Sequence, residues 1–165
     1  MKTLLANKEQ KIALGLILLA VATRLLPHPP NFAPITGIAL FAAARFQRKY
    51  LAVLIPFLSL FLTDLLLGLS AITWFVYAGF GLILLLGFQT KKTRITTVLL
   101  SSVLFFVVSN LGVWVLHYPL TLGGLTACYT LAIPFFTNTL LGDLVYTGVL
   151  FLSFSSIKQY VLQPR

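Results

Sequence analysis

Long apolar runs separated by short polar turns dominate the sequence. The runs cover about 12–26, 34–46, 51–68, 71–88, 95–116 and 138–157. An α-helix rises about 1.5 Å per residue, so roughly 20 apolar residues cross the hydrocarbon core of a bilayer. The pattern predicts an all-α membrane protein with six transmembrane helices, of which the one at 34–46 is short.

Helix breakers mark the ends of two of these runs. Pro27, Pro29 and Pro30 follow the first run, and proline lacks the backbone N–H and restricts the residue before it. Only the segment 68–70 separates the third run from the fourth. We therefore expect a proline-rich link after the first helix and a tight hairpin between the third and fourth helices.

The stretch 118–136 is uncharged and only partly apolar, with Gly123 and Gly124 near its start and Pro134 near its end. A seventh span here would place the basic C-terminus on the opposite side from the other basic segments. We therefore expect an outer loop or a half-inserted segment packed against protein, because irregular backbone at membrane depth is tolerated only there.

Composition supports the membrane assignment. Of the 165 residues, 59% are hydrophobic and 9% are charged, and the mean hydropathy is +0.99. Globular domains average about 25% charged residues, and a soluble fold of this size lacks the interior positions to hide so many apolar side chains. Residues 1–165 are expected to form one transmembrane domain, without room for a nucleotide-binding or soluble catalytic domain.

The basic residues predict the orientation. The formal net charge is +9, and 11 of the 12 Lys and Arg residues fall in the segments 2–11, 45–49, 91–94 and 158–165. With six spans these segments share one side of the membrane, which the positive-inside rule makes the cytoplasmic side. Both termini are therefore expected in the cytoplasm. Clustering between apolar runs also argues against a nucleic-acid partner.

The N-terminal segment has a second interpretation. Its lysines, its apolar centre and the run Ala20-Val21-Ala22 are typical of a cleavable signal peptide. The apolar run continues past that site into Leu25 and Leu26, which favours a helix that is retained.

Polar side chains gather at the predicted outer end. Asn110, Trp114 and His117 are spaced i, i+4 and i+7, so they share one face of the fifth helix. Asn138 and Asp143 lie in the first turns of the sixth helix, where lipid would penalise both side chains. We expect these five residues to bind a small-molecule substrate in an outward-opening pocket, with hydrogen bonds from Asn and Asp and ring stacking on Trp114.

Three further residues are expected at the entrance of this pocket. Arg24 follows the first run, Asp64 ends the third, and Cys128 lies in the stretch 118–136, where it would belong to a lid. Each has a structural alternative. Arg24 can snorkel to the interface or pair with Asp64 to hold helices together, and Cys128 can be a small buried apolar residue.

Signatures of an enzyme or a metal centre are missing. The sequence has no HExxH, no GxSxG and no phosphate-binding glycine loop. Its single cysteine excludes a Cys-only metal site within one chain. We expect no catalysis, no metal and no cofactor. A membrane-embedded enzyme that uses Asp64, His117, Cys128 or Asp143 is the least favoured alternative.

Three segments carry a resemblance to known proteins: 27–35 (PHPPNFAPI), 56–64 (PFLSLFLTD) and 132–143 (AIPFFTNTLLGD). They resemble a family of small, largely uncharacterised bacterial membrane proteins described as transport proteins. That family is similar to the substrate-binding S components of energy-coupling factor (ECF) transporters.

The resemblance implies an S-component-like bundle that binds a vitamin, a vitamin precursor or a metal ion near the outer face. S components then topple on a cytoplasmic module of two ATPases and a transmembrane coupling protein, which would be the partners here. Their Ala-xxx-Ala docking motif lies on the first helix, whereas the substitute in this sequence is Ala39 and Ala43 on the second. In some cobalamin transporters a cysteine ligates cobalt, so a corrinoid is the first candidate substrate and a thiamin-like or other ring-bearing vitamin the second.

The sequence therefore predicts an S-component-like transporter in the bacterial inner membrane that binds a small nutrient outside and moves it inward. Energy is expected from a partner ATPase, because the chain has no nucleotide-binding motif of its own. The main alternative is a structural or assembly subunit of a larger membrane complex.

Overall fold

The computed structural model is a bundle of six α-helices, and it describes residues 2–90 and 92–162. No strand occurs in this part of the chain, so the all-α prediction is confirmed. Helices two to five begin and end within two residues of the predicted apolar runs. The helices are α1 (Lys2–Thr23), α2 (Ile35–Arg45), α3 (Lys49–Leu67), α4 (Thr73–Gln89), α5 (Ile95–His117) and α6 (Leu122–Leu162).

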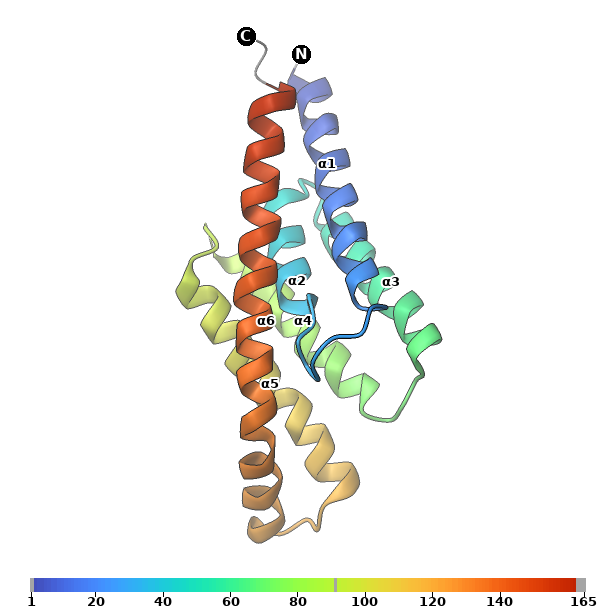
Figure 1. Cartoon of the computed structure of the whole chain (residues 1–165), viewed down its shortest axis with the longest axis vertical. Coiled ribbons are helices and arrows are strands. Elements are labelled where there is room, and N and C mark those ends of the chain that lie inside the picture. Colours follow the sequence, from blue (N-terminus) through green and yellow to red (C-terminus); the bar gives the residue numbers. More distant parts are fainter. Residues whose placement is uncertain (1, 91, 163–165) are drawn as a thin grey trace.

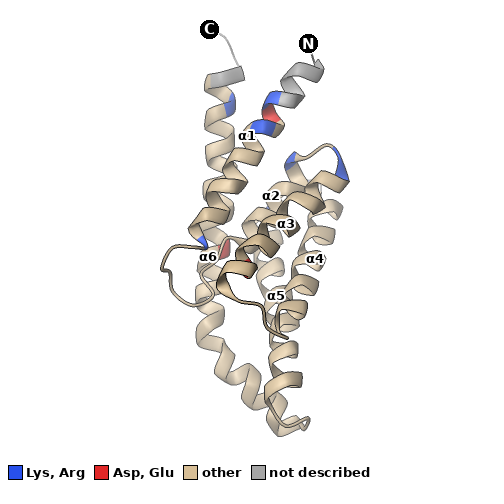
Figure 2. Cartoon of the chain, turned by 90° about the vertical axis from the view of Figure 1, so that its right-hand side faces the viewer, with Lys and Arg blue, Asp and Glu red and all other residues tan. Residues whose placement is uncertain are grey.

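Successive helices run in opposite directions along the long axis of the molecule, so both termini lie at the same end (Figure 1). Most of the described Lys and Arg residues also lie toward that end (Figure 2). Lys91 and Arg165, which contribute to the orientation argument, lie outside the described residues. The charge distribution of the described residues thus follows the pattern on which the orientation was predicted.

The short helix α2 is the centre of the bundle. It contacts each of the other five helices, and most of its residues are buried. A Cβ atom built on Gly37 would lie 3.0 Å from the backbone N of Thr147, so only glycine lets α2 and α6 approach this closely. A Cβ atom on Gly87 of α4 would lie 2.8 Å from the Cβ of Ala43, and Ala39 is fully buried. The predicted docking pair, Ala39 and Ala43, therefore serves packing inside the bundle.

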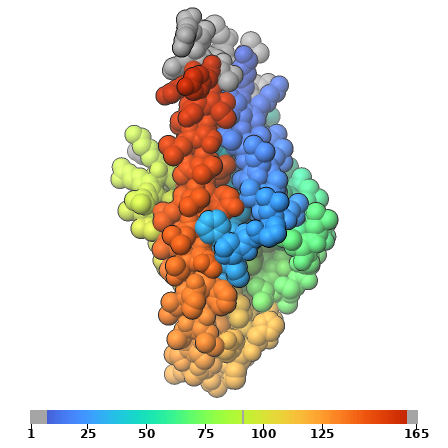
Figure 3. Space-filling view, viewed as in Figure 1, coloured from blue at the N-terminus to red at the C-terminus, as the bar shows by residue number. Residues whose placement is uncertain are grey.

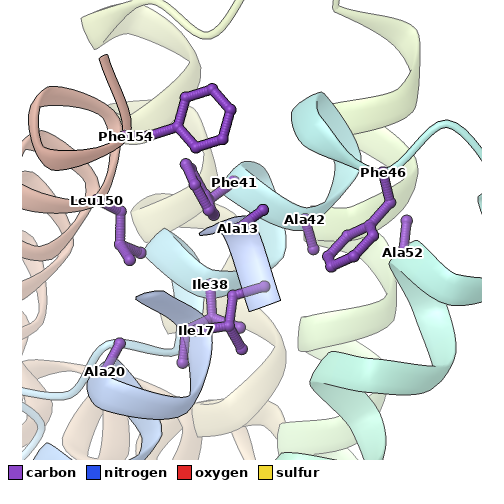
Figure 4. Close-up of a cluster of buried hydrophobic side chains, with 10 residues drawn as sticks. All are labelled: Ala13, Ile17, Ala20, Ile38, Phe41, Ala42, Phe46, Ala52, Leu150 and Phe154. Carbon is purple, nitrogen blue, oxygen red and sulfur yellow. The ribbon is translucent and has the colours of Figure 1, made fainter. Parts of the chain in front are cut away.

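Apolar side chains from α1, α2, α3 and α6 form a core around this central helix (Figure 4). Phe41 of α2 makes edge-on contacts with Phe151 and Phe154 of α6, with ring centroids 5.2 and 5.6 Å apart. One turn later, the guanidinium of Arg45 lies 4.5 Å from the centroid of the Phe154 ring. Aromatic and cation–π contacts thus fasten α2 to the last helix.

The hairpin between α3 and α4 is more open than predicted. Their link is short, and Gly68 within it has a positive φ of 105°. The two helices nevertheless make few close backbone contacts, and both pack on α2. The ring of Phe57 in α3 stands between them, 5.0 Å from the ring of Phe80 and 6.1 Å from that of Tyr77 in α4. Aromatic side chains thus supply contacts between the two helices.

The predicted outer loop over 118–136 is wrong, because most of this stretch is helical, and the depth to which it inserts into a membrane stays a prediction. Residues 118–121 form the link, and α6 continues from Leu122 through Pro134 without a break. Proline removes one backbone hydrogen bond, but a non-helical segment in an apolar environment would leave several backbone groups unsatisfied. With 41 residues α6 is about 60 Å long, roughly twice the thickness of a hydrocarbon core. Its first turns and the end of α5 form the lower tip of the molecule (Figure 3).

Three helices are long and apolar enough to cross a membrane by length and composition: Lys49–Leu67, Ile95–His117 and Leu122–Tyr160. Both α2 and α4 are shorter apolar helices. Large apolar side chains such as Leu66 and Leu152 are more than two-thirds exposed, and many others cover the outer surfaces of the bundle. Soluble monomers rarely expose so much apolar surface, so the arrangement is that of a membrane protein.

Candidate functional site

The bundle encloses a cavity of about 640 Å³. Its walls come from the α1–α2 link, the end of α3, the start of α4, the second half of α5 and the first half of α6. The volume falls within the range of about 300–1,000 Å³ that is typical of small-molecule sites.

The α1–α2 link forms one wall of the cavity and is fastened to α6. Asn31 turns the chain there with a positive φ of 63°, which asparagine tolerates better than most residues. Asn138 of α6 donates from Nδ2 to the carbonyl of Pro30 at 3.0 Å. Phe32 also packs against Tyr146, with ring centroids 5.6 Å apart. Asn138, predicted to bind substrate, therefore holds the wall of the cavity and does not line it.

Asp143 is the most deeply buried charged residue that lines the cavity. It is 2% exposed, and the hydroxyl of Ser102 in α5 donates to its Oδ2 at 2.6 Å. Thr36 of α2 lies beside the same carboxylate. Thr139, one turn earlier in α6, is buried as well and lines the cavity. The carboxylate thus stands where α2, α5 and α6 meet, surrounded by hydroxyl groups.

Arg24 and Asp64 form an ion pair at the edge of the cavity. Nη2 of Arg24 lies 2.8 Å from Oδ1 of Asp64, and the two side chains are 12% and 10% exposed. Nη1 also donates to the hydroxyl of Thr63 and, at 3.5 Å, to the carbonyl of Leu60. The pair therefore ties the end of α1 to α3. Both residues line the cavity, and their contact with a substrate stays a prediction.

Asn110 of α5 and Cys128 of α6 line the cavity side by side. Asn110 donates from Nδ2 to the carbonyl of Phe106 at 2.8 Å, which fixes its amide on the helix surface. Sγ of Cys128 lies 3.6 Å from the backbone oxygen of Asn110, and the residue is 2% exposed. The predicted place of Cys128 in a loop is wrong, because this residue lies on the buried face of a helix, and its role at the entrance stays a prediction.

Trp114 and His117 lie outside the cavity lining. Trp114 donates from Nε1 to the carbonyl of Pro119 at 3.1 Å and so tightens the turn between α5 and α6. His117 is exposed. Of the predicted face, only Asn110 reaches the cavity, because the Trp114 ring nitrogen is bound to the α5–α6 link and His117 is exposed.

One protein family matches residues 5–164, and its description is "Family of unknown function (DUF6580)". The chain belongs to the DUF6580 family. No curated protein matches the chain, and no solved structure matches it. The function of this DUF6580 protein is therefore argued from its own residues.

Several residues that line the cavity of this DUF6580 protein escaped the sequence analysis. Four aromatic residues contribute to the lining: Phe105, Phe106, Tyr118 and Phe135. In the part of the chain that the structure describes, no three His, Cys, Asp or Glu side chains gather as metal ligands. The cavity therefore combines aromatic walls with a few convergent polar groups, an arrangement that can hold a ring-bearing organic molecule.

Proposed function

We propose that this protein is an S-component-like membrane transporter that binds a small nutrient in the cavity and moves it inward. One observation carries the proposal. A cavity of about 640 Å³ is lined by Arg24, Asp64, Asn110 and Asp143 amid largely apolar walls. Small-molecule sites typically have this composition, in which apolar surface supplies affinity and a few polar groups supply orientation.

The proposed topology has six spans, with both termini in the cytoplasm of a bacterial inner membrane. The clustering of Lys and Arg toward the end that holds the termini supports it (Figure 2). The cavity then opens to the outer side. The shortness of α2 is compatible with this topology, because α2 is enclosed by the other helices and needs little contact with lipid.

The size of the cavity bears on the two candidate substrates. A volume of about 640 Å³ suits a drug-sized molecule, which a pocket of this class buries almost completely. A thiamin-like or other ring-bearing vitamin is of that size, whereas a corrinoid carries a large macrocycle with appended groups. Cys128, the residue that suggested a cobalt ligand, makes its contact with the backbone of Asn110. We therefore favour a ring-bearing vitamin over a corrinoid.

Accumulation of a nutrient requires an energy source, and the sequence has no phosphate-binding loop to supply it. We expect ECF-type ATPase and coupling subunits as partners. Because Ala39 is fully buried and Ala43 packs on α4, these partners would dock elsewhere on the bundle.

A structural or assembly subunit is the second candidate function, and one observation favours it. The charged groups at the cavity have partners inside the protein: Arg24 with Asp64, and Asp143 with Ser102. In that case substitution of Asp143 would weaken the fold or an assembly, and the cavity would bind no small molecule. An enzyme remains the least favoured function.

A thermal-shift screen tests the proposal. Detergent-purified protein is heated with vitamins, vitamin precursors and corrinoids, alongside the variant Asp143→Asn. A ligand that binds the folded state alone stabilises it by about 2.7 kcal/mol at a hundredfold excess over Kd. We expect one vitamin class to raise the melting temperature of the wild type but not that of Asp143→Asn.

Glu9→Gln is the matched control. It also converts a carboxylate to an amide, but Glu9 pairs with Lys158 near the termini, away from the cavity. This variant should respond to the ligand as the wild type does. A well-folded protein that responds to no compound would contradict the transporter proposal and favour the assembly subunit.

A further inference from the structure

Asp143 has no cationic partner in the part of the chain that the structure describes. The two ion pairs there are Arg24–Asp64 and Lys158–Glu9. The groups beside Asp143 are hydroxyls, which donate hydrogen bonds without supplying positive charge. A carboxylate that is 2% exposed is strongly destabilised without a counter-charge, so a proton or a cationic ligand must neutralise it.

The cavity gives a ligand direct access to this carboxylate. Its charged lining consists of Asp64, Asp143 and Arg24, hence two carboxylates and one guanidinium. Since Arg24 is paired with Asp64 at 2.8 Å, Asp143 is the lining carboxyl group that has no counter-charge, and it is negative whenever it is not protonated. Apolar walls lower the local dielectric and strengthen the attraction of this charge for a cation.

The rest of the lining indicates what kind of cation fits. Phe105, Phe106 and Phe135 place aromatic surface in the same cavity, and the faces of aromatic rings attract cationic groups. A single inorganic ion cannot fill about 640 Å³, and the described residues hold no cluster of metal ligands. An organic molecule with a positively charged nitrogen would both neutralise the Asp143 carboxylate and fill the apolar part of the cavity.

We propose that the substrate of this protein is an organic cation, with its charged nitrogen against Asp143 and its apolar body between the aromatic walls. The inference rests on the proposed transport function and narrows it to one chemical class. It assigns Asp143 the role of counter-ion for the substrate, while Ser102 orients the carboxylate by donating to Oδ2.

Probes that share a shape and differ in charge test the inference. One set is 1-methylnicotinamide (a cation), nicotinamide (neutral) and nicotinate (an anion), and the other is choline with its neutral isostere 3,3-dimethyl-1-butanol. Binding to the full-length protein in detergent is measured by thermal shift at millimolar concentrations of each probe. Sodium chloride and potassium chloride are measured in parallel to test inorganic cations. We expect a preference of about tenfold or more in Kd for each cation over its neutral partner.

Variants of the protein separate the counter-ion role from folding. Asp143→Asn should remove the preference for the cation, whereas Glu9→Gln, which converts a carboxylate away from the cavity, should retain it. If Asp143→Asn does not fold, the comparison of charged and neutral probes on the wild type still decides the question.

Three results would overturn the inference. They are equal binding of charged and neutral probes, no binding of any cation, and protection by sodium or potassium alone. If a neutral or anionic vitamin binds in the nutrient screen, the cation class is wrong and the transport function stands. If no compound of any charge binds the folded protein, the transport function falls as well.

Discussion

Two ion pairs of this protein have the same length but differ in burial. A comparison of their contributions to the free energy of unfolding therefore tests whether the Arg24–Asp64 pair beside the cavity is buried. The nitrogen–oxygen distance is 2.8 Å both in Arg24–Asp64 and in Lys158–Glu9. The side chains are 12% and 10% exposed in the first pair, but 46% and 34% exposed in the second. We predict that substitutions in the first pair destabilise the protein far more than those in the second.

The expected magnitude follows from burial. Removing one partner of a buried ion pair costs about 3–5 kcal/mol, because the other charge is left buried without a counter-charge. An exposed pair contributes about 0–1 kcal/mol. Because Arg24 and Asp64 border an open cavity, we expect a cost at or just below the lower limit of that range. Arg24→Gln should lower the free energy of unfolding by about 2–3 kcal/mol.

A double-mutant cycle measures this energy without the other contacts of either side chain. The free energies of unfolding in mild detergent are compared for wild type, Arg24→Gln, Asp64→Asn and the double variant. We expect a coupling energy above about 1 kcal/mol for this pair, and below about 0.5 kcal/mol for the matched cycle with Lys158→Gln and Glu9→Gln. Equal coupling in the two cycles would refute the reasoning from burial.

Three further predictions concern packing, a turn and an aromatic contact. Gly37→Ala should destabilise the protein by about 1–3 kcal/mol, because the new Cβ meets the backbone of α6 at 3.0 Å, whereas Gly148→Ala, with nothing within 4 Å, should not; equilibrium unfolding compares the two. Trp114→Phe should cost about 1 kcal/mol through its lost hydrogen bond and leave ligand binding unchanged in the thermal-shift assay. Arg45→Lys should lower the melting temperature slightly, because a planar guanidinium stacked on aromatic rings is replaced by an ammonium group.

Most of the helical architecture could be predicted because charges and prolines bound the apolar runs. The extent of the first and last helices could not be predicted. Residues 2–11 are polar yet belong to α1, which runs beside α6, where Glu9 reaches Lys158 at 2.8 Å. The continuity of α6 was missed because Gly123 and Pro134 break helices in water, whereas an apolar setting favours internal backbone hydrogen bonding.

The charged residues of the candidate site could be predicted from the sequence, whereas its hydroxyl-bearing and aromatic residues could not. Arg24, Asp64 and Asp143 stand out because charges are rare in apolar helices. Ser102 does not stand out, because hydroxyls in helices commonly bond their own backbone, and the hydroxyl oxygen of Ser102 also lies 3.0 Å from the carbonyl oxygen of Val98. Helical spacing placed Trp114 on the face of Asn110 but could not show that its ring nitrogen binds the carbonyl of Pro119 in the α5–α6 link.

The central claim is that a ligand cavity opens on the side of the membrane opposite the termini. Because Cys128 is the single cysteine, a Cys128→Ser background allows site-directed labelling with a membrane-impermeant maleimide on intact spheroplasts. Ser109→Cys tests the cavity lining, and Gln47→Cys tests the exposed α2–α3 link. We predict that Cys at 109 reacts from outside and Cys at 47 reacts only after permeabilisation. The reverse pattern, or labelling at 109 only after permeabilisation, would contradict the proposed topology and the outward-facing cavity.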